Sequence, residues 1–204
     1  MYRIGIMGGT FDPIHYGHLL AAEMARTEFA LAKVLFIPAG KPPHKDILKV
    51  TPAVIRYEMV QKAIADNNYF AVSDMELERQ GPSYTIDTLR FLHMTRESED
   101  LFFIAGTDSL KEVFSWRYAK ELFTLTQFIG VVRPGVDTKN FVEMSLQEFP
   151  EIEGRIHLLE VPALAISSTA IRQRVAQGKS IRYLLPEAVR MFIQENNLYI
   201  DPVN

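Results

Sequence analysis

Two histidines three residues apart are the first residues in this chain that suggest chemistry. His15 and His18 belong to the stretch MGGTFDPIHYGH, in which Gly8 and Gly9 end an apolar run and Gly17 lies just before the second histidine. At the entrance of a helix, this spacing turns both imidazoles to one side. Glycines let backbone N–H groups approach an anion, and the positive end of a helix favours the same ligand. The stretch is interpreted as a phosphate site, with a tight structural turn as the alternative.

Other roles for this stretch are less well supported. A zinc site needs a third ligand, and the chain has no cysteine and no HExxH pattern. Asp12 and Pro13 are expected to shape the turn, with an acid role for Asp12 as the alternative. The histidines are therefore interpreted as hydrogen-bond donors aimed at phosphate oxygens.

A second candidate anion site lies in ISSTAIR, residues 166–172. Ser167 or Ser168 is expected to cap a helix, which leaves free N–H groups pointed at an anion. Arg172 follows one helical turn later on the same face. The alternative is an ordinary serine-capped helix with a surface arginine.

These motifs are positioned by an alternation of strands and helices. Apolar runs predict strands over residues 2–7, 33–40, 69–77, 101–106, 126–135 and 155–161. Helical spacing predicts helices over residues 18–31, 53–67, 84–96, 107–123 (with a break near Ser115), 167–178 and 186–199. This order predicts an α/β fold whose mostly parallel sheet has helices on both faces. We expect a single domain, residues 1–204, with a small helical C-terminal part at about 167–200.

Composition narrows the classes of function. The chain has 204 residues, 48% of them hydrophobic and 23% charged, with a net charge of −3. With this net charge, the protein as a whole has no positive electrostatic potential that would attract nucleic acid. Any anionic ligand must therefore be held by cationic side chains placed close to it. No apolar run approaches the roughly 18 residues of a membrane span, and no signal peptide is recognised. We therefore expect a cytoplasmic protein that binds neither nucleic acid nor a membrane. The Gly-rich patterns of dinucleotide-binding oxidoreductases and P-loop NTPases are absent from the sequence.

The two motifs together resemble a known superfamily. GGTFDPIHYGH is similar to the GxFDxxHxGH signature of nucleotidyltransferases related to class I aminoacyl-tRNA synthetases, and ISSTAIR is similar to their ISSTxxR motif. The resemblance implies a Rossmann-like, doubly wound fold. It also implies that His15, His18 and Arg172 are catalytic. The residues it assigns to ATP binding are Gly8, Gly9, Thr10, Phe11, His15, His18, Gly106, Asp108, Ile166, Ser167, Ser168 and Arg172.

Four further segments resemble one family within that superfamily, the bacterial nicotinate mononucleotide adenylyltransferases. They are PPHK (42–45), GPSYTIDTL (81–89), GTDSLKEVFSWRY (106–118) and VVRPG (131–135). By this resemblance, the mononucleotide is bound by Lys41, His44, Lys45, Tyr84, Thr85, Trp116 and Arg133. Trp116 would stack on the pyridine ring, and Tyr84 and Thr85 would meet the nicotinate carboxylate through backbone N–H groups.

Each of these assignments has a structural alternative. Trp116 is otherwise a core or edge residue, and Ser83 or Thr85 a helix cap. Asp108 is otherwise the cap of a helix that begins near Ser109. Lys41, His44 and Lys45 otherwise form a solvated basic loop, and Arg133 a structural ion pair.

The reaction implied by the resemblance joins ATP to nicotinate mononucleotide and releases pyrophosphate. The acceptor phosphate is already anionic at neutral pH, so no general base is needed. Mg²⁺ would arrive with ATP, held mainly by phosphate oxygens and water. Alternatives are an adenylyltransferase acting on phosphopantetheine or nicotinamide mononucleotide, and a nucleotide-binding module without turnover. A homo-oligomer is expected from the family likeness alone.

Overall fold

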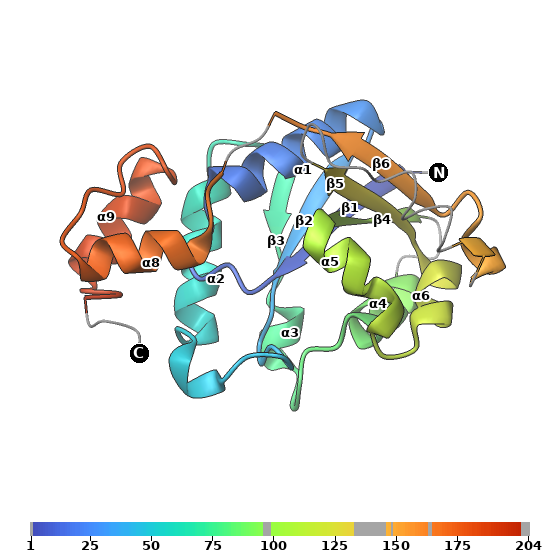
Figure 1. Ribbon diagram of the computed structural model, residues 1–204, viewed down its shortest axis with the longest axis horizontal. Helices are drawn as coiled ribbons and strands as arrows, with labels where there is room; N and C mark the ends of the chain where they lie inside the picture. The colour runs from blue at the N-terminus through green and yellow to red at the C-terminus, as the bar shows by residue number, and fades with distance from the viewer. Residues whose placement is uncertain (1, 96–98, 133–145, 148, 163–164, 201–204) are drawn as a thin grey trace. The chain divides into compact units, whose positions relative to one another are not determined.

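The computed structural model describes residues 2–95, 99–132, 146–147, 149–162 and 165–200 of the chain. Figure 1 shows its elements in chain order. The strands are β1 (Tyr2–Gly9), β2 (Lys33–Pro38), β3 (Phe70–Val72), β4 (Glu99–Gly106), β5 (Gln127–Val132) and β6 (Ile156–Glu160). The α-helices are α1 (Tyr16–Glu28), α2 (Ala53–Ile64), α3 (Met75–Glu78), α4 (Thr85–Thr95), α5 (Thr107–Glu112), α6 (Ala119–Leu125), α8 (Ser168–Ala176) and α9 (Glu187–Glu195). Short 3₁₀ turns span Ile47–Lys49, Val113–Ser115 and Pro150–Ile152.

The six strands form one sheet in the order β3-β2-β1-β4-β5-β6. The pairs β1–β4, β4–β5 and β5–β6 are parallel, with Ile6 opposite Phe103 and Gly130 opposite both Ala105 and Leu158. This is the strand order of a doubly wound Rossmann-like sheet, so the predicted fold class is confirmed. In such sheets ligands bind beyond the carboxyl ends of the strands where the order reverses, which here is between β1 and β4.

The chain groups into two compact units, each assembled from distant segments. The first contains Met1–Gly8, Ala21–Leu35 and Tyr84–Ala163, and the second Gly9–Leu20, Phe36–Ser83 and Leu164–Asn204. The single domain predicted from the sequence stays a prediction. Helices α8 and α9 do lie in the expected C-terminal part at 167–200.

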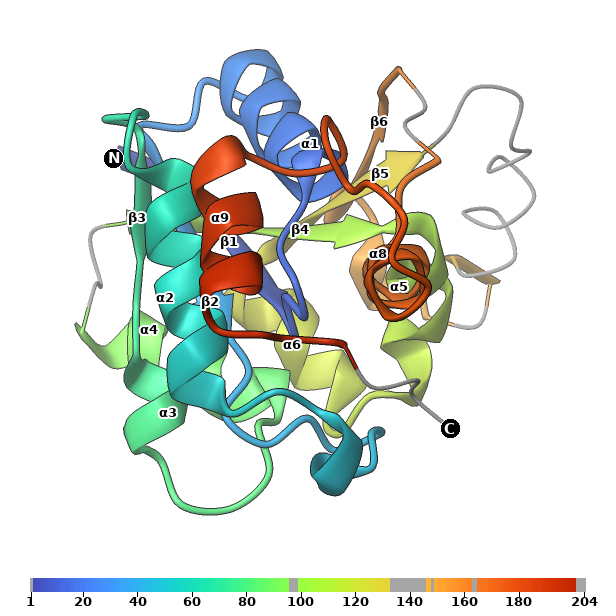
Figure 2. The same cartoon turned by 90° about the vertical axis from the view of Figure 1, so that its left-hand side faces the viewer.

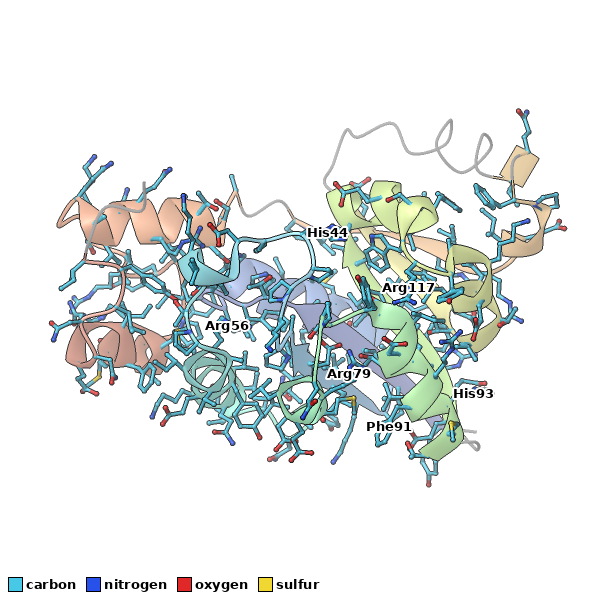
Figure 3. The ribbon with its side chains drawn as sticks, turned by 90° about the horizontal axis from the view of Figure 1, so that it is seen from below. His44, Arg56, Arg79, Phe91, His93 and Arg117 are labelled. Carbon is cyan, nitrogen blue, oxygen red and sulfur yellow. The ribbon has the colours of Figure 1, made fainter. Side chains whose placement is uncertain are left out.

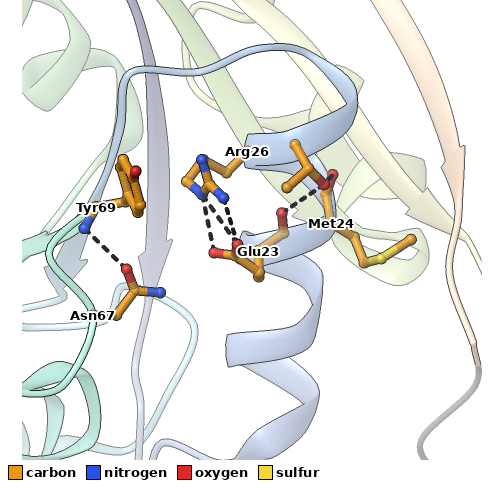
Figure 4. Close-up of polar contacts among 6 residues, drawn as sticks. Glu23, Met24, Arg26, Asn67 and Tyr69 are labelled. Carbon is orange, nitrogen blue, oxygen red and sulfur yellow. Dashed lines mark hydrogen bonds and ion pairs between the residues drawn. The ribbon is translucent and has the colours of Figure 1, made fainter.

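Within the first unit, α5 packs against β4 and β5, and α6 packs against α4 and β5. The buried runs Leu101–Ala105 and Phe128–Val132 form the apolar interior, as continuous apolar strands predict. Inside α1, the Arg26 guanidinium pairs with the Glu23 carboxylate at 2.6 Å (Figure 4).

Within the second unit, α2 packs against β3 and α9. Figure 2 shows α9 lying along α2, although the two helices are far apart in the sequence. On α9 the residues that face inward are Val189, Phe192 and Ile193. Just before β3, the N–H group of Tyr69 donates to the Asn67 side chain at 2.9 Å and fixes a turn (Figure 4).

Two boundaries differ from the sequence predictions, and one predicted break is confirmed. The strand predicted over 69–77 is wrong at its end, because β3 stops at Val72 and Met75–Glu78 is helical. The Ser73 hydroxyl accepts the Met75 N–H at 3.3 Å, and such local serine bonds favour a turn over a ladder. Helix α1 begins two residues earlier than predicted, at Tyr16. The predicted break near Ser115 is confirmed, because Trp116 is extended and Tyr118 has a φ of 56°.

None of the helices in the described part of the chain has the length and apolar character that a membrane crossing requires.

Candidate active site

The turn that follows β1 is tightly built around Phe11. Its side chain is buried, and its φ of 50° places the backbone in the left-handed region that non-glycine residues adopt rarely. A Cβ atom at Gly9 would lie 3.0 Å from the Phe11 ring, so a larger residue there would displace the ring. Backbone conformations of this kind concentrate at functional sites.

His15 and His18 face each other directly. Their ring centroids are 3.7 Å apart in a stacked arrangement, and the edge of the Phe11 ring meets His18 at 5.1 Å. The N–H group of His15 donates to Nδ1 of His18 at 3.3 Å. A ring nitrogen that accepts carries no proton, so neutral His18 holds its proton on Nε2. That N–H group is the one His18 has to offer a ligand.

Burial keeps both imidazoles neutral. It lowers the pKa of His15 to about 4. The pKa of His18 is lowered well below its ordinary value, first by burial and then by the charges of His15 and Lys45. At neutral pH the pair therefore supplies hydrogen-bond donors and no positive charge.

Gly17 has a specific role in this pair. A Cβ atom at this position would lie 3.0 Å from both Cε1 and Nδ1 of His15. The sequence suggested that Gly17 makes room for a ligand. The structure adds a second reason, since any side chain there would push the His15 imidazole out of its stack.

The second motif meets the first at two adjacent carbonyl groups. Ser167 caps α8 by accepting the Ala170 N–H at 3.1 Å, which confirms one of the two predicted caps. The Ser168 hydroxyl donates to the carbonyl oxygen of Pro13 at 2.8 Å, and Nη1 of Arg172 donates to that of Asp12 at 2.7 Å. The two motifs, separated by about 150 residues in the chain, therefore converge on one short turn.

Two buried polar atoms beside this turn have no partner in the described part of the protein. Within the described ranges, Nε of Arg172 and Nδ1 of His15 are buried without a hydrogen-bond partner. A buried polar atom left unpaired costs about 1–3 kcal/mol, so such atoms call for a functional explanation. Both flank the turn that the sequence assigned to phosphate.

Lys45 adds a cation to the same group. Burial, and then the positive charge of Arg172, lowers the pKa of Lys45, and Asp12 opposes this effect. The Lys45 ammonium group thus acts on Arg172, Asp12 and His18, all residues of the triphosphate motifs. Its assignment to the mononucleotide stays a prediction. The residues Lys41, His44 and Lys45 are all exposed, so the burial that acts on Lys45 is partial, and His44 is labelled in Figure 3.

The residues predicted to bind the mononucleotide ring lie in the first unit. The Trp116 indole meets the Phe103 ring edge-on at 5.9 Å and is partly exposed. The Arg117 guanidinium, labelled in Figure 3, lies 5.0 Å from the centroid of the Tyr84 ring. Thr85 is the first residue of α4. The Ser83 hydroxyl accepts the Lys41 N–H at 3.2 Å, and its alternative role as a helix cap stays a prediction.

For the remaining predicted site residues, the structure gives the position along the helices and strands, except for Arg133. Gly106 ends β4 and precedes α5, which begins at Thr107. Asp108 is the second residue of α5, so its alternative role as a cap before Ser109 is wrong. Ile166 lies just ahead of the α8 cap and is partly buried. Arg133 lies outside the described residues.

Comparison with known proteins places the chain in a family. A family model described as cytidylyltransferase-like matches residues 6–174. A protein of Desulfitobacterium hafniense, named as a probable nicotinate-nucleotide adenylyltransferase, is 56% identical over 97% of this chain and 95% of its own length. A protein of Moorella thermoacetica with the same name is 52% identical, with coverage of 97% and 91%. This chain belongs to the nicotinate-nucleotide adenylyltransferase family.

Solved structures of other family members share the fold. The nicotinic acid mononucleotide adenylyltransferase of Plasmodium falciparum, solved in complex with NaAD, superposes with a TM-score of 0.81 at 22% identity over 100% of both chains. A putative adenylyltransferase of this family from Vibrio parahaemolyticus gives a TM-score of 0.68 at 20% identity, covering 100% of this chain and 98% of its own. These similarities confirm the Rossmann-like fold of this adenylyltransferase family member.

One residue important to the site was missed from the sequence. Arg56 of α2 is fully buried and is labelled in Figure 3. Its guanidinium donates to the carbonyl oxygens of Thr10 at 2.6 Å, Thr51 at 2.7 Å and Ala39 at 2.6 Å. Because a trans peptide is planar, a Thr10 carbonyl turned toward Arg56 directs the next N–H group, that of Phe11, the opposite way.

The sequence did contain a signal for Arg56. It lies in helical register with Met59, Val60, Ala63 and Ile64, which form the buried face of α2. A charged side chain in the middle of an apolar face must be satisfied by hydrogen bonds inside the protein. Such a residue is therefore a candidate for fixing neighbouring loops through hydrogen bonds to their carbonyl oxygens.

Proposed function

We propose that this protein transfers the adenylyl group of ATP to nicotinate mononucleotide, giving nicotinate adenine dinucleotide and pyrophosphate in NAD biosynthesis. The observation that carries the proposal is that Ser168 and Arg172 of ISSTAIR bond to the carbonyl groups of Pro13 and Asp12, in the turn that leads directly into HYGH. Membership in the nicotinate-nucleotide adenylyltransferase family supports the choice of acceptor.

In the proposed reaction the acceptor phosphate attacks the α-phosphorus of ATP in line, and pyrophosphate leaves. The acceptor oxygen is anionic at neutral pH, so the protein provides neither a nucleophile nor a base. The protein contributes alignment and stabilisation of the charge that develops on the transferred phosphoryl group. The Nε2–H of His18 and the neutral His15 serve as donors, while Arg172 and Lys45 provide positive charge.

Neutral donors suit this reaction better than imidazolium ions. A charged pair stacked at 3.7 Å would repel, whereas neutral rings can stack at that distance without penalty. Preorganised N–H donors stabilise a developing oxyanion without reorganising during the reaction.

We propose that Mg²⁺ enters as part of the ATP substrate, coordinated by phosphate oxygens and water. The Asp12 carboxylate, which lies in the turn, already accepts hydrogen bonds from Tyr199 and from the Thr51 N–H group. The other half of the proposal is acceptor binding, with Trp116 stacking on the pyridine ring and Tyr84, Thr85 and Arg133 at its carboxylate and phosphate. A cytoplasmic location and a homo-oligomer complete the proposal.

A direct assay distinguishes the candidate functions. The purified protein is incubated with Mg-ATP and, separately, nicotinate mononucleotide, nicotinamide mononucleotide or phosphopantetheine, and pyrophosphate release is followed. We expect the highest kcat/KM with nicotinate mononucleotide. Preference for another acceptor would reassign the substrate, and ATP binding without pyrophosphate release with any acceptor would favour a binding module.

A further inference from the structure

The C-terminal part of the described chain reaches back to the turn that carries the catalytic motifs. The hydroxyl of Tyr199 donates to Oδ1 of Asp12 at 2.6 Å, across 187 residues of sequence. The other carboxylate oxygen of Asp12 accepts the N–H group of Thr51 at 3.2 Å. Only 4% of Asp12 is exposed, so these two donors hold a carboxylate that water scarcely reaches.

The main chain of the same residue holds Arg172. The Asp12 carbonyl oxygen accepts Nη1 of Arg172 at 2.7 Å, and the carbonyl of the next residue, Pro13, accepts the Ser168 hydroxyl. Any rotation of the Asp12 peptide would therefore shift the Arg172 guanidinium. Nε of this guanidinium is buried without a partner among the described residues and stays available for an anion.

The backbone around Tyr199 is arranged to deliver its side chain. After α9 the chain turns back, with the Leu198 N–H bonded to the Ile193 carbonyl at 3.0 Å. Asn197 and Tyr199 have φ values of 51° and 63°, which residues with a Cβ atom adopt rarely. Such conformations persist where surrounding contacts determine them. The Tyr199 hydroxyl contacts Asp12, Thr51 and, at 3.9 Å, the sulfur of Met59 on α2.

The hydroxyl stays protonated throughout the working range of pH. Burial, followed by the charge of Asp12, raises the pKa of Tyr199 above its ordinary value. Tyr199 is thus a constant donor to Asp12. A hydrogen bond to a charged acceptor is stronger than one between neutral groups and fixes the acceptor more firmly.

We infer that Tyr199 is a positioning residue of the ATP site, which acts through Asp12 to hold Arg172 in place for the triphosphate. The inference rests on the proposed function, in which Arg172 binds phosphate. The C-terminal segment is then part of the machinery that aligns ATP, and the acceptor site does not depend on it.

The test removes one oxygen atom. Tyr199→Phe keeps the aromatic ring and deletes the hydroxyl, and with it the donor to Asp12 and the hydroxyl contacts with Met59 and Thr51. Tyr183→Phe is the matched control, because Tyr183 also has a positive φ, of 66°, but is 82% exposed. For each variant we would measure kcat, the KM for ATP, the KM for nicotinate mononucleotide, and the Kd for ATP by calorimetry.

We expect kcat/KM for ATP to fall about 10- to 100-fold in Tyr199→Phe, since misplacement of a binding group by about 1 Å can cost about 10²-fold. The KM for nicotinate mononucleotide should stay within twofold, and Tyr183→Phe should match the wild type. A Tyr199→Phe protein with a lower melting temperature but unchanged ATP kinetics at 20 °C would overturn the inference and leave Tyr199 a structural residue.

A second variant keeps the test decisive if Tyr199→Phe does not fold. Asp12→Asn keeps the shape of the side chain and the Tyr199 hydroxyl but removes the charged acceptor. It should weaken ATP binding selectively, and adding Tyr199→Phe to it should have little further effect. Unchanged ATP binding in Asp12→Asn, or independent effects of the two changes, would contradict the inference. If the wild type bound ATP but formed no dinucleotide, the proposed function would be refuted. The inference on Tyr199 could still be tested, because calorimetry measures ATP binding without turnover.

Discussion

The neutral state of His15 leads to a quantitative prediction about stability and pH. Only 6% of His15 is exposed, and burial lowers its pKa from 6.5 to about 4. Between these two values the unfolded chain binds a proton at this site and the folded protein does not. The unfolding free energy must therefore fall as the pH falls from 6.5 toward 4, and this contribution is fully present above pH 6.5.

The size of the effect follows from the gap between the two pKa values. At about 1.36 kcal/mol per unit, the gap between 6.5 and about 4 corresponds to about 3 kcal/mol. By pH 4.5 most of this, about 2.5 kcal/mol, should already be lost relative to pH 7.5. Carboxylates also titrate in this range, so the effect must be isolated with a variant.

The assay is urea unfolding followed by circular dichroism at several pH values from 7.5 to 4.5. His15→Gln replaces the imidazole with a side chain that does not titrate, so its stability should fall by about 2.5 kcal/mol less than that of the wild type. His93→Gln removes an exposed histidine of α4 and serves as the matched control. If wild type and His15→Gln lost stability in parallel, His15 would be charged in the folded protein, and its role as a neutral donor would be refuted.

Four substitutions test the other parts of the site. His18→Ala should fold normally and lose at least about 10²-fold in kcat, because it removes a donor used in the transition state, and near-normal turnover would leave HYGH a structural motif. Trp116→Ala should raise the KM for nicotinate mononucleotide with the KM for ATP unchanged, and unaltered acceptor binding would rule out stacking. Gly17→Ala should displace the His15 ring, 3.0 Å from the new Cβ, and lower kcat about tenfold, whereas full activity would show that the ring adapts. Arg56→Lys cannot replace all the hydrogen bonds to three loop segments, so urea unfolding should show a loss of about 3 kcal/mol, and a stability equal to the wild type would refute the assigned contacts.

The sequence predicted what depends on local pattern. Apolar runs and helical spacing predicted the alternation of strands and helices and hence a mostly parallel sheet, whereas the reversal of strand order between β1 and β4 is seen in the structure. The cap at Ser167 was predictable because capping needs only neighbouring residues. The break predicted near Ser115 is confirmed by the extended backbone of Trp116.

What the sequence did not predict depends on contacts between distant segments. Arg56 bonds to Thr10 and Ala39, and Tyr199 to Asp12, through pairs that no local periodicity links. The short helix Met75–Glu78 was missed because four residues carry too little periodicity to distinguish a helix from a strand end. The roles of the residues assigned to the mononucleotide stay predictions, and one of them, Arg133, lies outside the described residues.

The central claim, adenylyl transfer without a covalent intermediate, is tested most directly by following isotopic label. The protein is incubated with nicotinate mononucleotide and ATP that carries ³²P at either the α- or the γ-position, and the products are separated. The α-label should appear in nicotinate adenine dinucleotide and the γ-label in pyrophosphate, in equal amounts and with no label retained on the protein. Release of either label as inorganic phosphate, or capture of the α-label on the protein itself, would contradict the mechanism.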